Sequence, residues 1–329
     1  MSTSKRTQAV RHWRIPRWLR FTAAIVPLVW IFSRIEPREL IEASGRVAWW
    51  TVPTVLCIAL SVMVLQGVRW WLLMFAFMPE LPLKSTLTVH FKALFYSLAL
   101  PSSAAQDVVR AAVLARQADY SIVWGATWVA RLLGLLVLVL LSLMGLTQLD
   151  TQVAPAHIHL VISGTIILIA VLLVFSFSKK VTKRLRPAFQ RILPYKITRI
   201  VEEIRQAIYV YIHKLPTLLG VLVITLAMQL LLILNATLLI MGITGEFLFE
   251  IVLSFIPLIE ILCLSLPLTP NGIGVREALL ALMFNQVGLS EEQLGLYVVI
   301  GFLVSALKVV GGVPILWESV TARNTDKNG

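Results

Sequence analysis

The organisation of this chain is decided by one stretch, Leu264-Ser-Leu-Pro-Leu-Thr-Pro-Asn-Gly-Ile-Gly-Val-Arg-Glu-Ala-Leu-Leu280. It places two prolines, two glycines, an arginine and a glutamate between hydrophobic runs long enough to lie in a bilayer. Non-helical backbone at membrane depth is tolerated only where protein buries it or where it lines a wet cavity. Ionisable side chains at that depth are functional candidates by default. The stretch therefore predicts a broken helix that carries functional residues.

A second stretch aligns with the first without a gap, at an offset of 166 residues: Leu98-Ala-Leu-Pro-Ser-Ser-Ala-Ala-Gln-Asp-Val-Val-Arg-Ala-Ala-Val-Leu114. Pro101 falls on Pro267, and Arg110 falls on Arg276. Leucine and alanine matches are common in so apolar a chain, so the argument depends on the proline and the arginine. These two matches predict an internal duplication.

The composition assigns the chain to the integral membrane proteins. Of 329 residues, 58% are hydrophobic and 14% are charged, whereas soluble domains carry about 25% charged residues. The net charge of +12 is placed unevenly, so it indicates membrane orientation and not nucleic-acid binding. Cys57 and Cys263 both lie in apolar runs, and the histidines form no ligand set. We expect no disulfide, no metal and no cofactor.

Basic segments mark the cytoplasmic side of the membrane. Residues 1–20 carry six cations and no acid, and residues 179–214 carry ten cations against Glu202 and Glu203. Trp49–Trp50 and Trp70–Trp71 are expected to bracket one span as interfacial belts, with Arg69 closing it and residues 79–92 forming a connection at the inner surface. We expect about six full spans, near residues 21–32, 47–66, 122–146, 158–177, 218–241 and 294–317.

Each of the two aligned stretches is expected to form a re-entrant helical hairpin. In the first, over about 88–120, Ser102 and Ser103 offer an N-cap, and Asp107 and Arg110 share one helix face. An amphipathic helix lying on the membrane surface is the alternative. Three full spans separate the hairpins, so the two halves, about 47–146 and 216–318, are antiparallel. Inverted repeats with broken helices are typical of secondary transporters.

The broken helices offer groups suited to an anion. Glycines allow close backbone approach, the N–H groups at a helix start favour an anion, and arginine binds phosphate bidentately. Arg131 and Lys308, each in the span after its hairpin, add cations. The candidate binding residues are Arg69, Ser102, Ser103, Asp107, Arg110, Arg131, Asn271, Gly272, Gly274, Arg276, Glu277 and Lys308.

A structural role for the same charges is the alternative. Arg110 could pair with Asp107, and Arg276 with Glu260 or Glu277, because buried ions usually pair. Glu260 and Glu277 could instead carry a coupling proton, and the sequence does not choose between these roles.

Over roughly 18–320 the chain resembles the lysylphosphatidylglycerol synthase transmembrane-domain family, also called flippase-like domain proteins. This family includes the membrane half of the multiple peptide resistance factor. The family's motif Pro-Gly-Gly-x-Gly-x-x-Glu is similar to Pro270-Asn-Gly-Ile-Gly-Val-Arg-Glu277 of this chain. The family's first motif is similar to Leu100-Pro-Ser followed by Asp107-x-x-Arg110. Gly67-Val-Arg69-Trp70 and Arg131-x-x-Gly134 also resemble family positions. The departure is Ala105-Gln106, where relatives commonly carry glycines.

The resemblance implies translocation of lipid between leaflets, without the soluble domain that gives some relatives their aminoacyl-transfer chemistry. We expect an all-α integral membrane protein, not an enzyme, with a basic cytoplasmic tail over 1–18, one flippase-like domain over 19–320 and a cytoplasmic tail over 321–329. Its expected place is the inner membrane, with both termini cytoplasmic.

The expected partner is an anionic phospholipid or a polyprenyl-phosphate-linked lipid, and a homo-oligomer or a partner synthase is left open. One alternative function is an accessory scaffold for a lipid-modifying enzyme or glycosyltransferase, docked through the basic segment 179–214. The other is a membrane enzyme acting on lipid phosphates, although no cluster of His, Asp and Ser recurs at the hairpins.

The antiparallel arrangement predicts opposite exposure of the two hairpin loops. With Cys57 and Cys263 replaced by serine, Ala104→Cys and Asn271→Cys should react with a membrane-impermeant thiol reagent from opposite sides of sealed vesicles. Labelling of both positions from the same side would contradict the inverted repeat.

Overall fold

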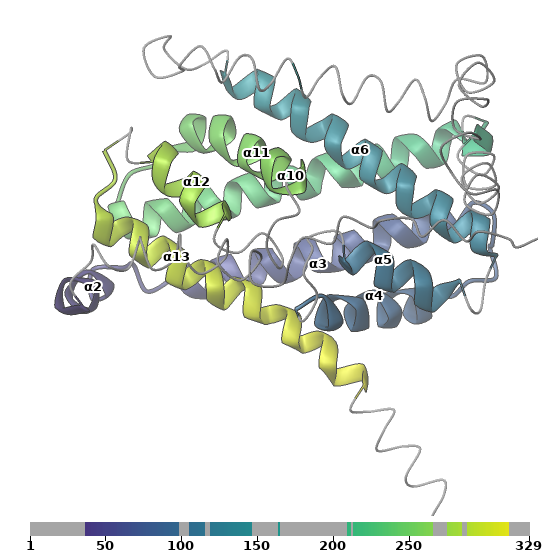
Figure 1. Cartoon of the computed structure of the whole chain (residues 1–329), viewed down its shortest axis with the longest axis horizontal. Helices are drawn as coiled ribbons and strands as arrows, with labels where there is room; N and C mark the ends of the chain where they lie inside the picture. Colours follow the sequence, from purple (N-terminus) through teal and green to yellow (C-terminus); the bar gives the residue numbers. More distant parts are fainter. Residues whose placement is uncertain are drawn as a thin grey trace, which may run out of the picture.

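The computed structural model describes residues 37–98, 105–115, 119–146, 164, 209–211, 213–265, 275–284 and 288–315, and this part of the chain is helical throughout its regular elements (Figure 1). The predicted all-α class is confirmed. The helices are α2 Pro37–Ser44, α3 Thr51–Phe75, α4 Leu83–Ser97, α5 Ala105–Leu114, α6 Tyr120–Leu146, α10 Leu215–Thr244, α11 Phe249–Ser265, α12 Val275–Phe284 and α13 Glu291–Ala306, which the 3₁₀ helix η3 Leu307–Gly312 extends.

Four of the described helices are long and apolar enough to cross a membrane: α3, α6, α10, and α13 together with its extension to Ile315. They make the chain a multi-pass membrane protein. The predicted spans near 21–32 and 158–177 lie outside the described residues, apart from residue 164, so the count of six stays a prediction.

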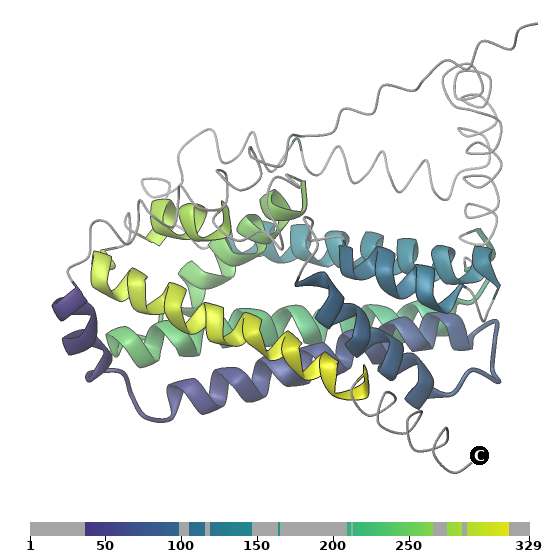
Figure 2. The same cartoon turned by 60° about the horizontal axis from the view of Figure 1, so that its bottom comes forward.

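The centre of the bundle is the pair α3 and α10, which lie side by side along the long axis of the molecule (Figures 1 and 2). Asn235 of α10 donates its side-chain N–H to the carbonyl of Val55 in α3 at 2.7 Å. Gly242 leaves the space that the side chain of Thr51 fills, so the helices approach closely at this end. The α6 helix packs along α11, where Val137 and Leu141 join a shared apolar core with Leu253 and Phe255.

Two predictions about the first half are wrong. The helix α3 does not close at Arg69 but continues to Phe75, because no helix-breaking residue follows before Pro79. Trp70 is fully buried inside the protein and does not lie in an interfacial belt, whereas Trp49 is 88% exposed. The region 79–92 is not simply a connection, since α4 begins at Leu83 directly after the extended Pro82.

Two pairs of short helices occupy corresponding places in the chain. In both views α4 and α5 lie towards one end of the bundle, and α11 and α12 towards the other (Figure 2). The helix α11 begins at Phe249, 166 residues after the start of α4 at Leu83, which is the offset of the aligned stretches. The turns of both pairs lie outside the described residues, so the re-entrant and inverted arrangement stays a prediction.

The close packing of α6 on α11 is open to test at Gly145. A methyl group there would lie 2.6 Å from the Cα of Ser254 and 2.7 Å from its backbone nitrogen. Because backbone cannot move aside cheaply, Gly145→Ala should destabilise the protein by about 1–3 kcal/mol. Thermal unfolding in detergent, followed by tryptophan fluorescence, measures the effect.

The matched control is Gly301→Ala in α13, where an added methyl meets nothing within 4 Å. This change should be neutral or should stabilise by up to about 1 kcal/mol, from helix propensity alone. Equal unfolding temperatures for the two variants would contradict the close approach of α6 and α11.

Candidate functional site: a cavity with three arginines

Three arginines from three helices meet in one cavity, which we call the arginine cavity. Arg69 comes from α3, Arg110 from α5 and Arg131 from α6, and the cavity volume is ≈ 170 Å³. Its wall is formed by Gln66, Arg69, Gln106, Asp107, Arg110, Ala130, Arg131, Gly134, Leu135, Leu138, Met228, Gln229, Leu232 and Glu260.

Asp107 joins two of these arginines. One carboxylate oxygen accepts from Nη2 of Arg110 at 3.0 Å, and the other accepts from Nη1 of Arg131 at 2.9 Å. The first contact lies within α5, one turn apart, while the second connects α5 to α6. A single carboxylate thus pairs with two guanidinium groups and holds the short helix against a long one.

Arg110 is held from a second side by an aromatic ring. Its side chain is only 2% exposed, and its guanidinium carbon lies 4.8 Å from the ring centre of Trp70. Trp70 donates its indole N–H to Thr127 on α6 at 3.0 Å, which fixes the orientation of the ring. A cation on an aromatic face is worth about 2 kcal/mol or more when it is desolvated. The ion pair and the aromatic ring therefore hold the Arg110 side chain in one conformation.

Arg69 differs from the other two because it has no carboxylate within ion-pair distance among the described residues. Its one side-chain hydrogen bond within the described part of the chain is long, at 3.5 Å from Nη1 to the hydroxyl of Thr225 on α10. Its Nε is buried and has no partner in the described part of the chain. Gly134 lies next to the guanidinium group of Arg69, since a Cβ added at Gly134 would lie 3.6 Å from Nη1 of Arg69. Arg69 thus presents unused donors in the cavity wall.

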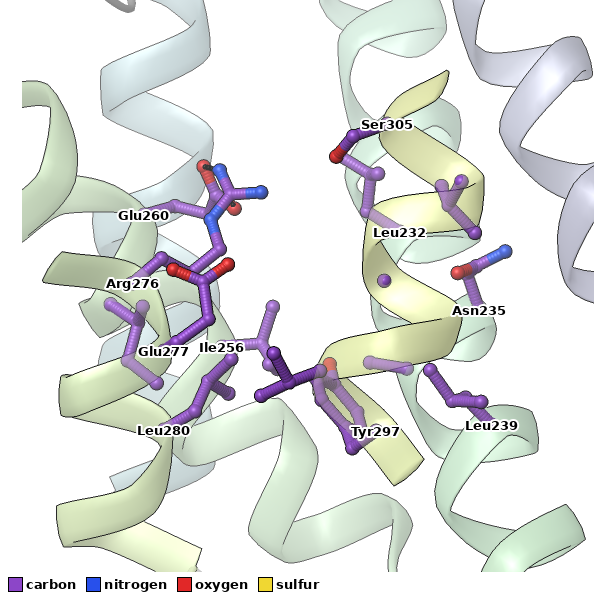
Figure 3. A pocket seen from close by; sticks show the side chains of 15 residues that line it. Leu232, Asn235, Leu239, Ile256, Glu260, Arg276, Glu277, Leu280, Tyr297 and Ser305 are labelled. Carbon is purple, nitrogen blue, oxygen red and sulfur yellow. Dashed lines mark hydrogen bonds and ion pairs between the residues drawn. The ribbon is translucent and has the colours of Figure 1, made fainter. Parts of the chain in front are cut away.

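A second cavity, of ≈ 130 Å³, lies among α10, α11, α12 and α13, and we call it the Arg276 cavity (Figure 3). Nη2 of Arg276 lies 2.7 Å from one oxygen of Glu260 and 3.0 Å from the other. Arg276, Glu260 and Glu277 form one wall and face Ser305 and Asn235 across the gap (Figure 3). The side chains of the ion pair are 39% and 26% exposed, so the pair is accessible.

The two cavities are neighbours, because Glu260 and Leu232 line both of them. Glu260 thus stands at the boundary, with Arg276 on one side and the three arginines on the other. Charged and polar side chains continue from one cavity into the next through the interior of the bundle.

Most of the described candidate residues come together as expected. Arg69, Asp107, Arg110 and Arg131 share the first cavity, and Glu260, Arg276 and Glu277 line the second. The pairs Arg110–Asp107 and Arg276–Glu260, which the sequence offered as structural alternatives, are both present. Lys308 lies in η3 and lines neither cavity. The remaining candidates lie outside the described residues: Ser102, Ser103, Asn271, Gly272 and Gly274.

The sequence interpretation missed the polar residues of α10. Thr225, Gln229 and Asn235 all take part in the site or its supports, and Gln106 of α5 also donates to Gln66 of α3 at 3.3 Å. A signal existed: in a long apolar helix, the polar residues Thr225 and Gln229 lie four residues apart, which is the spacing of one helix face.

The shared carboxylate yields a stability prediction. Asp107→Asn leaves two arginines without an ion pair and should destabilise the protein by about 3–5 kcal/mol. The double variant Asp107→Asn/Arg131→Gln should lose less stability than Asp107→Asn alone, because it removes one of the two unpaired positive charges. Thermal unfolding in detergent measures both, with Glu246→Gln, an exposed loop position, as a control expected within about 0.5 kcal/mol of wild type. Additive losses would contradict the shared pairing.

Comparison with known proteins identifies the family of this chain. The profile of the family described as lysylphosphatidylglycerol synthase TM region matches residues 17–311. No curated protein matches the chain. No solved structure matches it either. The profile covers nearly the whole sequence, including every described residue of both cavities, and the chain therefore belongs to the lysylphosphatidylglycerol synthase transmembrane-region family.

Proposed function

We propose that this protein moves an anionic lipid or lipid-linked precursor across the bacterial inner membrane, and that it does so without aminoacyl-transfer chemistry. The observation that carries the proposal is the arginine cavity: three guanidinium groups and one aspartate, enclosed by apolar helices. Membership of a membrane family named for lipid synthesis supports a lipid as the cargo.

The charge of the cavity favours an anionic cargo. Asp107 balances one of the three arginines in charge, and Arg69 has no carboxylate partner among the described residues. Isolated charges away from water are expensive, so proteins pair them or bind a counter-ion. A phosphate supplies that counter-ion, since a guanidinium fork matches two phosphate oxygens.

The second cavity gives the headgroup a continuing polar path. Glu260 belongs to both cavities, and Arg276 meets it from the side of α12. An arriving phosphate can replace Glu260 as the partner of Arg276, because both are oxygen acceptors for the same donors. Glu260 and Glu277 are the carboxylates that we propose for any coupling to protons.

Lipid scrambling in reconstituted vesicles tests the proposal. Vesicles containing wild-type protein should expose tail-labelled anionic lipid from the inner leaflet much faster than empty vesicles. Arg276→Ala and Arg131→Ala should each slow this exposure by about tenfold or more, because a hydrogen bond to a charged group contributes about 1.5–3 kcal/mol. Quenching of the label by an impermeant reductant gives the rate.

Arg46→Ala is the control, since this exposed arginine follows α2 and lines neither cavity. It should scramble at the wild-type rate. If wild type scrambles no more than empty vesicles across a panel of anionic lipids, the transport proposal fails.

A further inference from the structure

We infer that the arginine cavity holds a phosphomonoester, a phosphate with two negative charges, in preference to the singly charged phosphodiester of ordinary phospholipids. This inference rests on the proposed function and names the chemical class of its cargo. It is drawn from the charges, donors and partners that line the cavity.

The wall of the arginine cavity carries a surplus of positive charge. Arg69, Arg110 and Arg131 contribute three positive charges, and Asp107 contributes one negative charge. Glu260 also reaches the wall, but both of its oxygens lie within 3.0 Å of Arg276, which balances it. The local surplus is therefore two positive charges.

The size of the surplus decides between the two classes of phosphate. A phosphodiester carries one negative charge and would leave one guanidinium uncompensated in an apolar surrounding, at a cost. A phosphomonoester carries about 1.5 to 2 negative charges near neutral pH, so it balances the cavity.

The wall of the arginine cavity also carries a surplus of hydrogen-bond donors. A guanidinium has five N–H groups. Asp107 takes one donor each from Arg110 and Arg131, and Arg69 makes only the 3.5 Å contact to Thr225. Three acceptor oxygens of a monoester can use these donors, whereas a diester offers two unesterified oxygens. The surplus of donors thus points to the same class as the surplus of charge.

The experiment compares tail-labelled phosphatidic acid, a monoester, with tail-labelled phosphatidylglycerol and cardiolipin, both diesters, in the same vesicles. Wild type should scramble phosphatidic acid about tenfold faster than phosphatidylglycerol, which corresponds to one further charge-assisted contact. Arg69→Gln reduces the surplus to one and should bring the two rates close to equal. Arg69→Lys keeps the charge and should keep most of the preference, which separates charge from folding.

A binding measurement makes the inference independent of transport. Short-chain phosphatidic acid should raise the unfolding temperature of the detergent-solubilised wild type more than short-chain phosphatidylglycerol does, and Arg46→Gln should behave as wild type. If no lipid is scrambled but this difference in stabilisation persists, the transport proposal fails and the monoester site stands. Stabilisation by glycerol 3-phosphate equal to that by phosphatidic acid also supports the site, and identifies a soluble phosphate as its source.

Three results would overturn the inference while leaving transport intact. The first is equal scrambling and equal stabilisation by phosphatidic acid and phosphatidylglycerol. The second is a preference for cardiolipin, whose two charges lie on separate phosphates. An unchanged monoester preference in folded Arg69→Gln would also overturn it, since the charge surplus would then not set the selectivity.

Discussion

The structure depends on one carboxylate shared between two arginines. Asp107 accepts from Arg110 within its own helix and from Arg131 on the neighbouring helix. These contacts hold the short α5, which is too short to span a bilayer, against the long α6. In an apolar surrounding such pairing is required, because a buried charge without a partner costs several kcal/mol. This junction brings Arg110 and Arg131 together in the wall of the arginine cavity.

The two arginines at corresponding places in the aligned stretches are balanced in different ways. Arg110 is paired within its own helix and covered by Trp70, so it is enclosed. Arg276 pairs across to Glu260 on the preceding helix and remains partly exposed. One half of the molecule therefore presents a rigid cation and the other an accessible ion pair. This difference suits the path that we propose, in which a headgroup is bound firmly at one position and exchanged at the next.

Much of the fold could be predicted from the sequence, and the errors have a physical origin. Apolar run lengths predicted α6 and α10 closely, since spans of this length have few alternatives in a bilayer. The end of α3 was misplaced because Arg69 and Trp70 were interpreted as interfacial residues. That assignment assumes that a charged or aromatic side chain meets the membrane surface. Here Trp70 instead packs beneath Arg110 inside the protein, which sequence spacing cannot show.

Hydropathy and helix length are local properties, so the amino-acid sequence was enough to predict a helical membrane protein with cations inside its helices. The sequence also predicted that Arg110 could pair with Asp107, since a spacing of three residues brings side chains to one helix face. The packing of the helices was needed to show that Arg69 and Arg131 share a cavity with that pair, and that Glu260 borders both cavities. These contacts connect residues of different helices, and their partners are chosen by how the helices cross and pack.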